Sequence, residues 1–231
     1  MIGIIGAMKV EVDAIKKHVK NLETKFISEH IFYTGKILDK EVVICLSGVG
    51  KVAASMATTI LLSNFDVEEV INIGTAGGLL ERQNTMDVVL SQNVIQHDFD
   101  TSYIDGIEGK GKLFESSNDL TERVKEAFSS IDMKFSLYIG DIVSGDIFVG
   151  EEEKFEKILE DFPTAIACDM ESGAIGQVCS RLKTPFVIVR SLSDIVYHDN
   201  SNIDFMSNLQ KTSERSAEMV VKYLEDRKLS L

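Results

Sequence analysis

Residues 68–78 read EEVINIGTAGG, an apolar β-branched run that leads into a glycine-rich turn. Two similar runs occur elsewhere, IGII at residues 2–5 and FVIV at residues 186–189. None of the three alternates apolar with polar residues, a pattern typical of strands that are covered by helices on both faces. Because helical patterns follow such strands along the chain, we predict an α/β fold, a single-domain three-layer sandwich with a central mixed β-sheet flanked by helices.

The chain has 231 residues, of which 44% are hydrophobic, and a formal net charge of −13. At this length we predict one domain spanning residues 1–231. The acidic excess argues against nucleic-acid and membrane partners, which attract clusters of lysine and arginine. The three cysteines lack disulfide or metal spacing, the first residues carry no basic leader, and no apolar run is long enough to cross a membrane. We therefore expect a cytoplasmic protein.

Periodicity and turn residues predict the remaining elements. Strands are expected at residues 2–5, 32–38, 41–46, 69–73, 88–96, 137–143 and 186–189. Helices are expected at residues 10–19, 51–62, 120–131, 151–159, 171–182 and 202–228. The polar, glycine-containing stretch Asp98–Asp119 is predicted to be a long loop.

Three carboxylates stand near predicted strand ends or helix starts. Glu11 follows the first strand, Glu171 begins a helix, and Asp194 follows the strand at residues 186–189. Ligands of open α/β sheets bind beyond the carboxyl ends of the strands, so the three carboxylates meet at one rim if their strands run parallel. The glycine-rich turn at residues 74–78 would add backbone amides there.

Carboxylates with few cations suit sugar hydroxyls and a cationic transition state better than they suit a phosphate. Cleavage of a glycosidic bond needs one acid to protonate the leaving group and one base to activate water. A carboxylate at a helix N-terminus stays ionised, whereas one in a drier pocket at a strand end can hold a proton. This group of residues therefore predicts glycosidic chemistry.

Two other features predict ordinary structure. The sequence SGVGK at Ser47–Lys51 lacks the first glycine and the final Ser or Thr of a phosphate-binding loop, so we expect a turn between a strand and a helix. The four histidines have no metal-ligand spacing, and we predict no metal site. His97, beside Asp98 at a strand end, is the least ordinary of the four.

Six ordered motifs, which together span nearly the whole chain, connect it with a known family. They are IGIIGAM with Glu11, SGVGKVAA from Ser47, INIGTAGGL from Ile71, IVSGDIFVG from Ile142, CDMESGAI from Cys168 and VIVRSLSD from Val187. With these motifs the chain resembles the 5′-methylthioadenosine/S-adenosylhomocysteine nucleosidases of the purine nucleoside phosphorylase-like superfamily. The resemblance implies hydrolysis of the N9–C1′ bond of an adenine thionucleoside, in methionine salvage and methyl-cycle recycling. It also implies a homodimer that uses no metal or organic cofactor.

The resemblance implies the catalytic and sugar-binding roles. Asp194 is expected to protonate adenine N7, with support from Ser193. Glu11 is expected to position and activate the water molecule. Glu171 is expected to accept hydrogen bonds from the ribose hydroxyls, and Met170 to pack under the sugar.

The resemblance also implies the purine-binding and 5′ pockets. Phe148 is expected to stack on adenine, and the Val149 backbone to read its edge. Thr75, where the family more often has Ser, is expected near the water and the sugar, and Arg190 near the water. Phe205 is expected to border the 5′ pocket.

The chain departs from the family pattern in two places. Lys9 and Val10 stand where the family often has acids, but neither is the catalytic position. The stretch Phe99–Phe114 lacks the family's usual aromatic-and-glycine pattern, and a partner subunit is implied to close the 5′ pocket through residues 101–104 within it. The preferred 5′ substituent, whether methylthio, homocysteinyl, deoxy or futalosine-like, therefore stays open.

Two other functions also stay open. A purine nucleoside phosphorylase would bind phosphate, for which arginine is the natural bidentate donor. The turn at Gly74 contains no arginine, and the first loop offers only Lys9, so we prefer a hydrolase. A non-catalytic nucleoside-binding protein of the same fold would not need an acid and a base.

Overall fold

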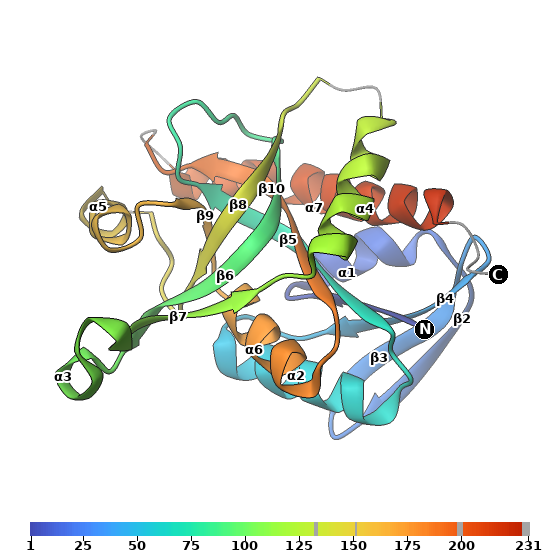
Figure 1. Cartoon of the computed structure of the whole chain (residues 1–231). Coiled ribbons are helices and arrows are strands. Elements are labelled where there is room, and N and C mark those ends of the chain that lie inside the picture. Colours follow the sequence, from blue (N-terminus) through green and yellow to red (C-terminus); the bar gives the residue numbers. More distant parts are fainter. Residues whose placement is uncertain (132–133, 151, 198–200, 228–231) are drawn as a thin grey trace.

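The computed structural model describes residues 1–131, 134–150, 152–197 and 201–227 (Figure 1). Ten strands form one mixed sheet: β1 (Ile2–Gly6), β2 (Val19–Ile27), β3 (His30–Ile37), β4 (Lys40–Leu46), β5 (Glu69–Gly78), β6 (Val88–Asp100), β7 (Lys110–Glu115), β8 (Leu137–Ser144), β9 (Ala165–Asp169) and β10 (Phe186–Ile195). The helices are α1 (Lys9–Lys16), α2 (Lys51–Asn64), α3 (Ser102–Asp105), α4 (Asn118–Ser129), α5 (Glu152–Asp161), α6 (Ser172–Leu182) and α7 (Ser201–Asp226), with a 3₁₀ turn η1 at Gly106–Gly109. No helix in these described ranges is long and apolar enough to span a membrane.

The sheet is open at one side and closed into a ring at the other. β1 lies between β4 and β5 and is parallel to both, and β3 and β2 extend the β4 side as antiparallel strands. On the other side β10 pairs in parallel with β5 and antiparallel with β6. The order β5–β9–β8–β6–β10 therefore returns to β5, and these five strands close on themselves.

Helices cover both faces of the sheet, as the continuous apolar runs predicted. Ile4 of β1 and Val187 of β10 point into a core shared with α1, α4 and α7, whereas their neighbours Ile5 and Ile188 point into a second core with α2 and α6. Figure 1 shows α2 and α6 side by side below the sheet, with α1, α4 and α7 on the opposite side. The predicted α/β fold with a central mixed sheet is confirmed.

Three strands were missed by the sequence analysis, namely β2, β9 and β7, of which β7 lies within the stretch Asp98–Asp119. β2 is an exposed edge strand without an apolar period, and Val19 begins it rather than extending α1, which ends at Lys16. β9 is short and directly precedes Met170 and Glu171. It runs antiparallel to β5, so the expected parallel arrangement holds for β1 and β10 but not for the strand before Glu171.

The stretch Asp98–Asp119, predicted as a loop, is mostly regular structure. β6 continues to Asp100, α3 and η1 follow, and β7 returns antiparallel to β6. Figure 1 shows α3 at the tip of an extension, away from the main body. No apolar period marked these residues because most of them are exposed.

Other predicted boundaries shift by a few residues. β5 and β10 run past their predicted ends, so residues 74–78 and Asp194 lie inside strands rather than after them. The turn at Ser47–Lys51 is confirmed, since β4 ends before it and α2 begins at Lys51. Three positions of the sequence analysis, Glu151, His198 and Lys228, lie outside the described residues.

Candidate active site

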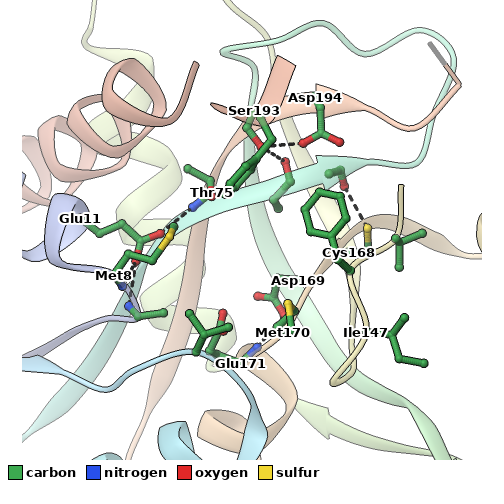
Figure 2. A pocket seen from close by; sticks show the side chains of 17 residues that line it. Met8, Glu11, Thr75, Ile147, Cys168, Asp169, Met170, Glu171, Ser193 and Asp194 are labelled. Carbon is green, nitrogen blue, oxygen red and sulfur yellow. Dashed lines mark hydrogen bonds between the residues drawn. The ribbon is translucent and has the colours of Figure 1, made fainter. Parts of the chain in front are cut away.

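A cavity of about 300 Å³ lies where the carboxyl ends of β1, β5, β8, β9 and β10 meet (Figure 2). Ligand sites of α/β proteins occur at such strand ends. The predicted site residues that line it are Glu11, Thr75, Phe148, Val149, Met170, Glu171, Ser193, Asp194 and Phe205. Arg190 is buried behind the wall of the cavity rather than in its lining.

Glu11 lies in the first turn of α1 and turns back toward the end of β1. Its Oε2 accepts hydrogen bonds from the amides of Ala7 at 2.8 Å and Met8 at 2.9 Å, and its Oε1 accepts one from the Thr75 amide at 3.2 Å. Burial raises the pKa of Glu11, while the Arg190 guanidinium and the three amides oppose the rise. Figure 2 shows the carboxyl group fixed between β1 and β5.

Arg190 lies behind Glu11 and stabilises the wall of the cavity through hydrogen bonds. Its Nε and Nη2 donate to Asp169 Oδ2 at 2.9 and 2.7 Å, and Nη2 also donates to Asn72 Oδ1 at 2.6 Å. Its Nη1 has no hydrogen-bond partner among the residues that the structure describes. A Cβ at Gly74 would lie 3.1 Å from this Nη1 and 2.6 Å from Glu11 Oε1. Because Gly74 has no Cβ, the Arg190 guanidinium and the Glu11 carboxylate can both lie close to the backbone at this position.

Asp194 owes its direction to an irregularity in β10. The register with β5 shifts just before Asp194, which leaves Ser193 as the extra residue of a β-bulge. Bulges change the direction of side chains, and both residues line the cavity. Burial raises the pKa of Asp194 to about 6, although Ser193 Oγ donates a hydrogen bond of 2.7 Å to its Oδ1. A carboxyl group with such a pKa can act as a general acid.

Glu171 is the N-cap residue of α6. Its Oε1 accepts a hydrogen bond of 2.9 Å from the amide of Gly50, at the start of α2. Burial raises the pKa of Glu171, the neighbouring Asp169 carboxylate raises it further, and Arg190 opposes both. The side chain is therefore a buried hydrogen-bonding group with a fixed orientation, suited to hydroxyls.

An apolar wall faces these carboxyl groups. The Phe148 ring meets the Phe205 ring edge to face, with centroids 5.7 Å apart and planes at 74°. Phe148 is 40% exposed. Val149 and Met170 also line the cavity. Aromatic faces and flexible sulfur-containing side chains suit a flat heterocycle.

The sequence analysis missed several lining residues, namely Ala7, Met8, Val49, Ala76, Gly77, Ile147, Cys168 and Asp169. Asp169 and Cys168 belong to the same motif as Met170, and that adjacency could have identified them. The closeness of Val49 depends on the position of β4 beside β1, for which the local sequence holds no signal.

Comparisons with known proteins identify the family of this chain. The family model described as the phosphorylase superfamily matches residues 1–225. A 5′-methylthioadenosine/S-adenosylhomocysteine nucleosidase from Shewanella denitrificans is 40% identical, over 97% of this chain and 99% of its own. The crystal structure of such a nucleosidase from Neisseria meningitidis, in complex with methylthio-immucillin-A, has a TM-score of 0.92 and 33% identity over 98% and 99% of the two chains.

A futalosine hydrolase from Helicobacter pylori is also similar, with a TM-score of 0.90 and 29% identity over 98% of this chain and 97% of its own. These matches confirm the resemblance that the six motifs predicted. The chain belongs to the phosphorylase superfamily and, within it, to the 5′-methylthioadenosine/S-adenosylhomocysteine nucleosidases, which are hydrolases of N-glycosyl compounds.

Proposed function

We propose that this chain hydrolyses the N-glycosidic bond of 5′-methylthioadenosine and S-adenosylhomocysteine, and also accepts 5′-deoxyadenosine. The observation that carries the proposal is the placement of Asp194 and Glu11 in one cavity. Asp194 has a pKa of about 6, and Glu11 accepts three backbone hydrogen bonds. Burial raises the pKa of both groups, but three backbone amides and the Arg190 guanidinium favour the ionised form of Glu11, whereas Asp194 has only the Ser193 hydroxyl. This difference in surroundings suits Glu11 as the base and Asp194 as the acid.

In the proposed reaction the N9–C1′ bond breaks as the proton of Asp194 passes to N7 of the purine. Adenine then leaves as a neutral base, and positive charge develops on the ribose. A water molecule attacks C1′ and loses a proton to Glu11. The surrounding carboxyl groups stabilise the cationic transition state because they are fixed in a water-poor cavity.

The sugar is proposed to lie against Glu171, Met170 and Thr75. Glu171 accepts hydrogen bonds from the ribose hydroxyls, and Met170 packs under the ring. Arg190 is proposed to orient the attacking water through Nη1, the guanidinium nitrogen that faces Gly74 beside Glu11.

The purine is proposed to stack on Phe148 while the Val149 backbone reads its edge. Phe205 borders the 5′ substituent, and its edge-to-face contact with Phe148 supports the placement of the base beside that pocket. The methylthio-immucillin-A complex of the Neisseria relative, and an adenine complex of a Colwellia psychrerythraea relative, support this class of ligand.

Water rather than phosphate is proposed as the nucleophile. The cavity lining, as far as the described residues form it, contains no lysine, arginine or histidine. Arg190 behind the lining already has two hydrogen bonds to Asp169 and one to Asn72. A phosphate would meet the carboxyl groups of Glu11 and Glu171, and such like-charge contacts are unfavourable.

The test is adenine release from 5′-methylthioadenosine by the purified chain, with and without inorganic phosphate. We expect the same rate in both. Strict dependence on phosphate would make the protein a phosphorylase and remove the role of Glu11 as a base. Binding without any release would favour the non-catalytic alternative.

The activity is expected to depend on pH through Asp194. The acid must be protonated, and burial raises its pKa to about 6. For free enzyme and substrate, kcat/KM should therefore fall by about tenfold for each pH unit above this value. A pH profile of kcat/KM from pH 5 to 9 checks this, and a profile that is flat up to pH 9 would contradict the assignment.

A homodimer is proposed as the working form. Exposed apolar side chains lie on α2, at Val52 and Met56, and on α3, at Tyr103 and Ile104. Residues 101–104 would reach the 5′ pocket of the partner, as the family resemblance implies. Sedimentation equilibrium should give twice the chain mass, and a monomer that retains full activity would contradict this proposal.

Residues 1–231 act as one catalytic domain, and the carboxyl groups of the cavity supply the chemistry without a metal or an organic cofactor. We place the enzyme in the cytoplasm. Its three cysteines are free and buried, which fits a reducing compartment.

A further inference from the structure

Outside the cavity, the Asp98 carboxylate closes a ring of hydrogen bonds between three segments. Its Oδ1 pairs with Lys51 Nζ, and its Oδ2 accepts a hydrogen bond of 2.9 Å from the Asp146 amide. Asp146 Oδ1 in turn accepts a hydrogen bond of 2.7 Å from the Lys51 amide. Asp98 belongs to β6, Lys51 begins α2, and Asp146 follows β8. We call these three residues the Asp98 clamp.

The Asp98 clamp lies at the surface, where Asp98 and Asp146 are exposed residues, but the side chains of its ion pair are partly shielded from solvent. The side chains of Lys51 and Asp98 are 19% and 20% exposed. Burial opposes ionisation of Asp98, but hydrogen bonds from Lys51 and the Asp146 amide outweigh it and hold the pKa of Asp98 below its usual range. Asp98 is therefore a carboxylate at neutral pH, and hydrogen bonds to an ionised acceptor are stronger than neutral ones.

The clamp also supplies a helix cap. The N-cap residue of α2 is Gly50, which has no side chain to accept a hydrogen bond from the first turn. Asp146 fills this role from another segment by accepting the Lys51 amide. Its negative charge also interacts favourably with the helix dipole at the N-terminus of α2.

Both ends of the clamp lead into the cavity. Asp146 shortly precedes Phe148 and Val149, the proposed purine-binding residues. Lys51 directly follows Gly50, whose amide holds the carboxyl group of Glu171. The clamp thus connects the loop of Phe148 and Val149, which would bind the purine, to the turn at Gly50, whose amide orients Glu171 for the ribose.

The loop depends on such contacts because residues 145–150 belong to no helix or strand. His97 supports it from the side of β6. A Cβ at Gly145 would lie only 2.4 Å from His97 Nε2, and this nitrogen has no hydrogen-bond partner in the described part of the chain. The loop is therefore in contact with His97 at Gly145 and fastened by the clamp at Asp146.

We propose that Asp98 is a positioning residue that fixes the purine-binding loop against the start of α2. The inference rests on the proposed function, because it assigns the purine to Phe148 and Val149. A displaced loop weakens the binding of substrate and transition state alike. Such a loss of uniform binding raises KM and leaves kcat unchanged.

The test compares two variants with a matched control in the purified full-length chain. Asp98→Asn removes the charge of the clamp, and Gly145→Ala pushes the loop away from His97 without replacing any residue of the clamp. The control is Glu69→Gln, a buried carboxylate at the amino end of β5 that bonds Tyr223 and Arg227. KM and kcat for 5′-methylthioadenosine, and the Kd of adenine by calorimetry, are measured for each.

Both loop variants should raise KM and the adenine Kd by about tenfold, with kcat within about twofold of the parent chain. Glu69→Gln should lower Tm and leave all three constants unchanged. Unchanged constants in folded Asp98→Asn overturn the inference. An equal rise in Glu69→Gln also overturns it, since the effect would then be general destabilisation. A fall in kcat at constant KM does the same.

The adenine measurement separates this inference from the proposed function. If the parent chain binds adenine but releases none from 5′-methylthioadenosine, the proposed hydrolysis fails. A tenfold weaker adenine Kd in Asp98→Asn and Gly145→Ala would still support the positioning role. If the parent chain binds no adenine, both fail together.

Discussion

Asp194→Asn is expected to lower kcat for adenine release by about 10³-fold, within the range of about 10²–10⁴ for loss of an acid–base group. Asparagine has nearly the same shape but cannot give a proton to the purine. Ser193 Oγ can still donate to the amide oxygen, so the bulge and the cavity should keep their shape. The nucleoside should therefore bind with little change. Single-turnover adenine release and calorimetric Kd measure the two effects separately.

The matched control is Asp141→Asn on β8, outside the cavity lining, where the carboxylate accepts hydrogen bonds from Asn93 and Thr164. Its kcat should stay within about twofold of the parent chain. If Asp194→Asn keeps its kcat but loses affinity, Asp194 is a binding residue and the proposed acid must lie elsewhere.

Asp194→Asn is also expected to change the stability of the protein. Burial raises the pKa of Asp194 from 3.8 to about 6, so the folded state disfavours its ionised form. A raised carboxyl pKa means that folded protein binds this proton more tightly than unfolded protein, and stability falls as pH rises from about 4 to beyond 6. Asparagine removes this cost. Asp194→Asn should therefore raise Tm relative to the parent chain at pH 8 but not at pH 4.

Arg190→Met is expected to lower the free energy of unfolding by about 3–5 kcal/mol, the usual cost of removing one partner from a buried ion pair. The side chains of Arg190 and Asp169 are 1% and 2% exposed, so little water can replace the guanidinium. Asp169 would keep its hydrogen bonds from Ser172 but lose its cation. Thermal unfolding at pH 8 should show a Tm lower by roughly 10 °C for a chain of this length.

The control is Arg123→Met, because Arg123 is 35% exposed and its partner Glu69 keeps Arg227 and Tyr223. A loss of about 1 kcal/mol is expected there. The loss of unfolding free energy in Arg190→Met should become smaller toward pH 5. The buried carboxylates that remain, Glu11 among them, can then take up protons. Equal losses of unfolding free energy in the two variants, or a loss in Arg190→Met that is independent of pH, would show that the buried ion pair stabilises the protein no more than the exposed one.

The central strands could be predicted because both of their faces are buried. In β1, Ile4 and Ile5 serve opposite cores, so the sequence shows a continuous apolar run whatever the neighbouring strands are. The same reasoning found Glu11 and Asp194, since side chains at the ends of such strands reach a common rim. These signals are local, and they can be read without knowing the order of the strands in the sheet.

Features that depend on distant partners could not be predicted. β2 is exposed along its length and shows no period, and β9 has the sequence AIACD, in which two alanines and a single β-branched residue give a weak strand signal. The ion pair that places Arg190 behind the cavity needs Asp169 and Asn72, which lie far from it in the sequence. The hydrogen bond from the Gly50 amide to Glu171 likewise joins segments that no local pattern connects. The roles within the site came from resemblance and remain proposals.

The closed ring of strands has a consequence for biosynthesis. β10 is the last strand among the described residues, yet it stands between β5 and β6 and completes the ring. Until it is made, a nascent chain exposes the unpaired edges of both neighbours, which are prone to pair with other chains. The same late segment brings Asp194, and α7 after it brings Phe205. Catalytic competence and protection from aggregation therefore arrive together, once β10 and α7 have been made.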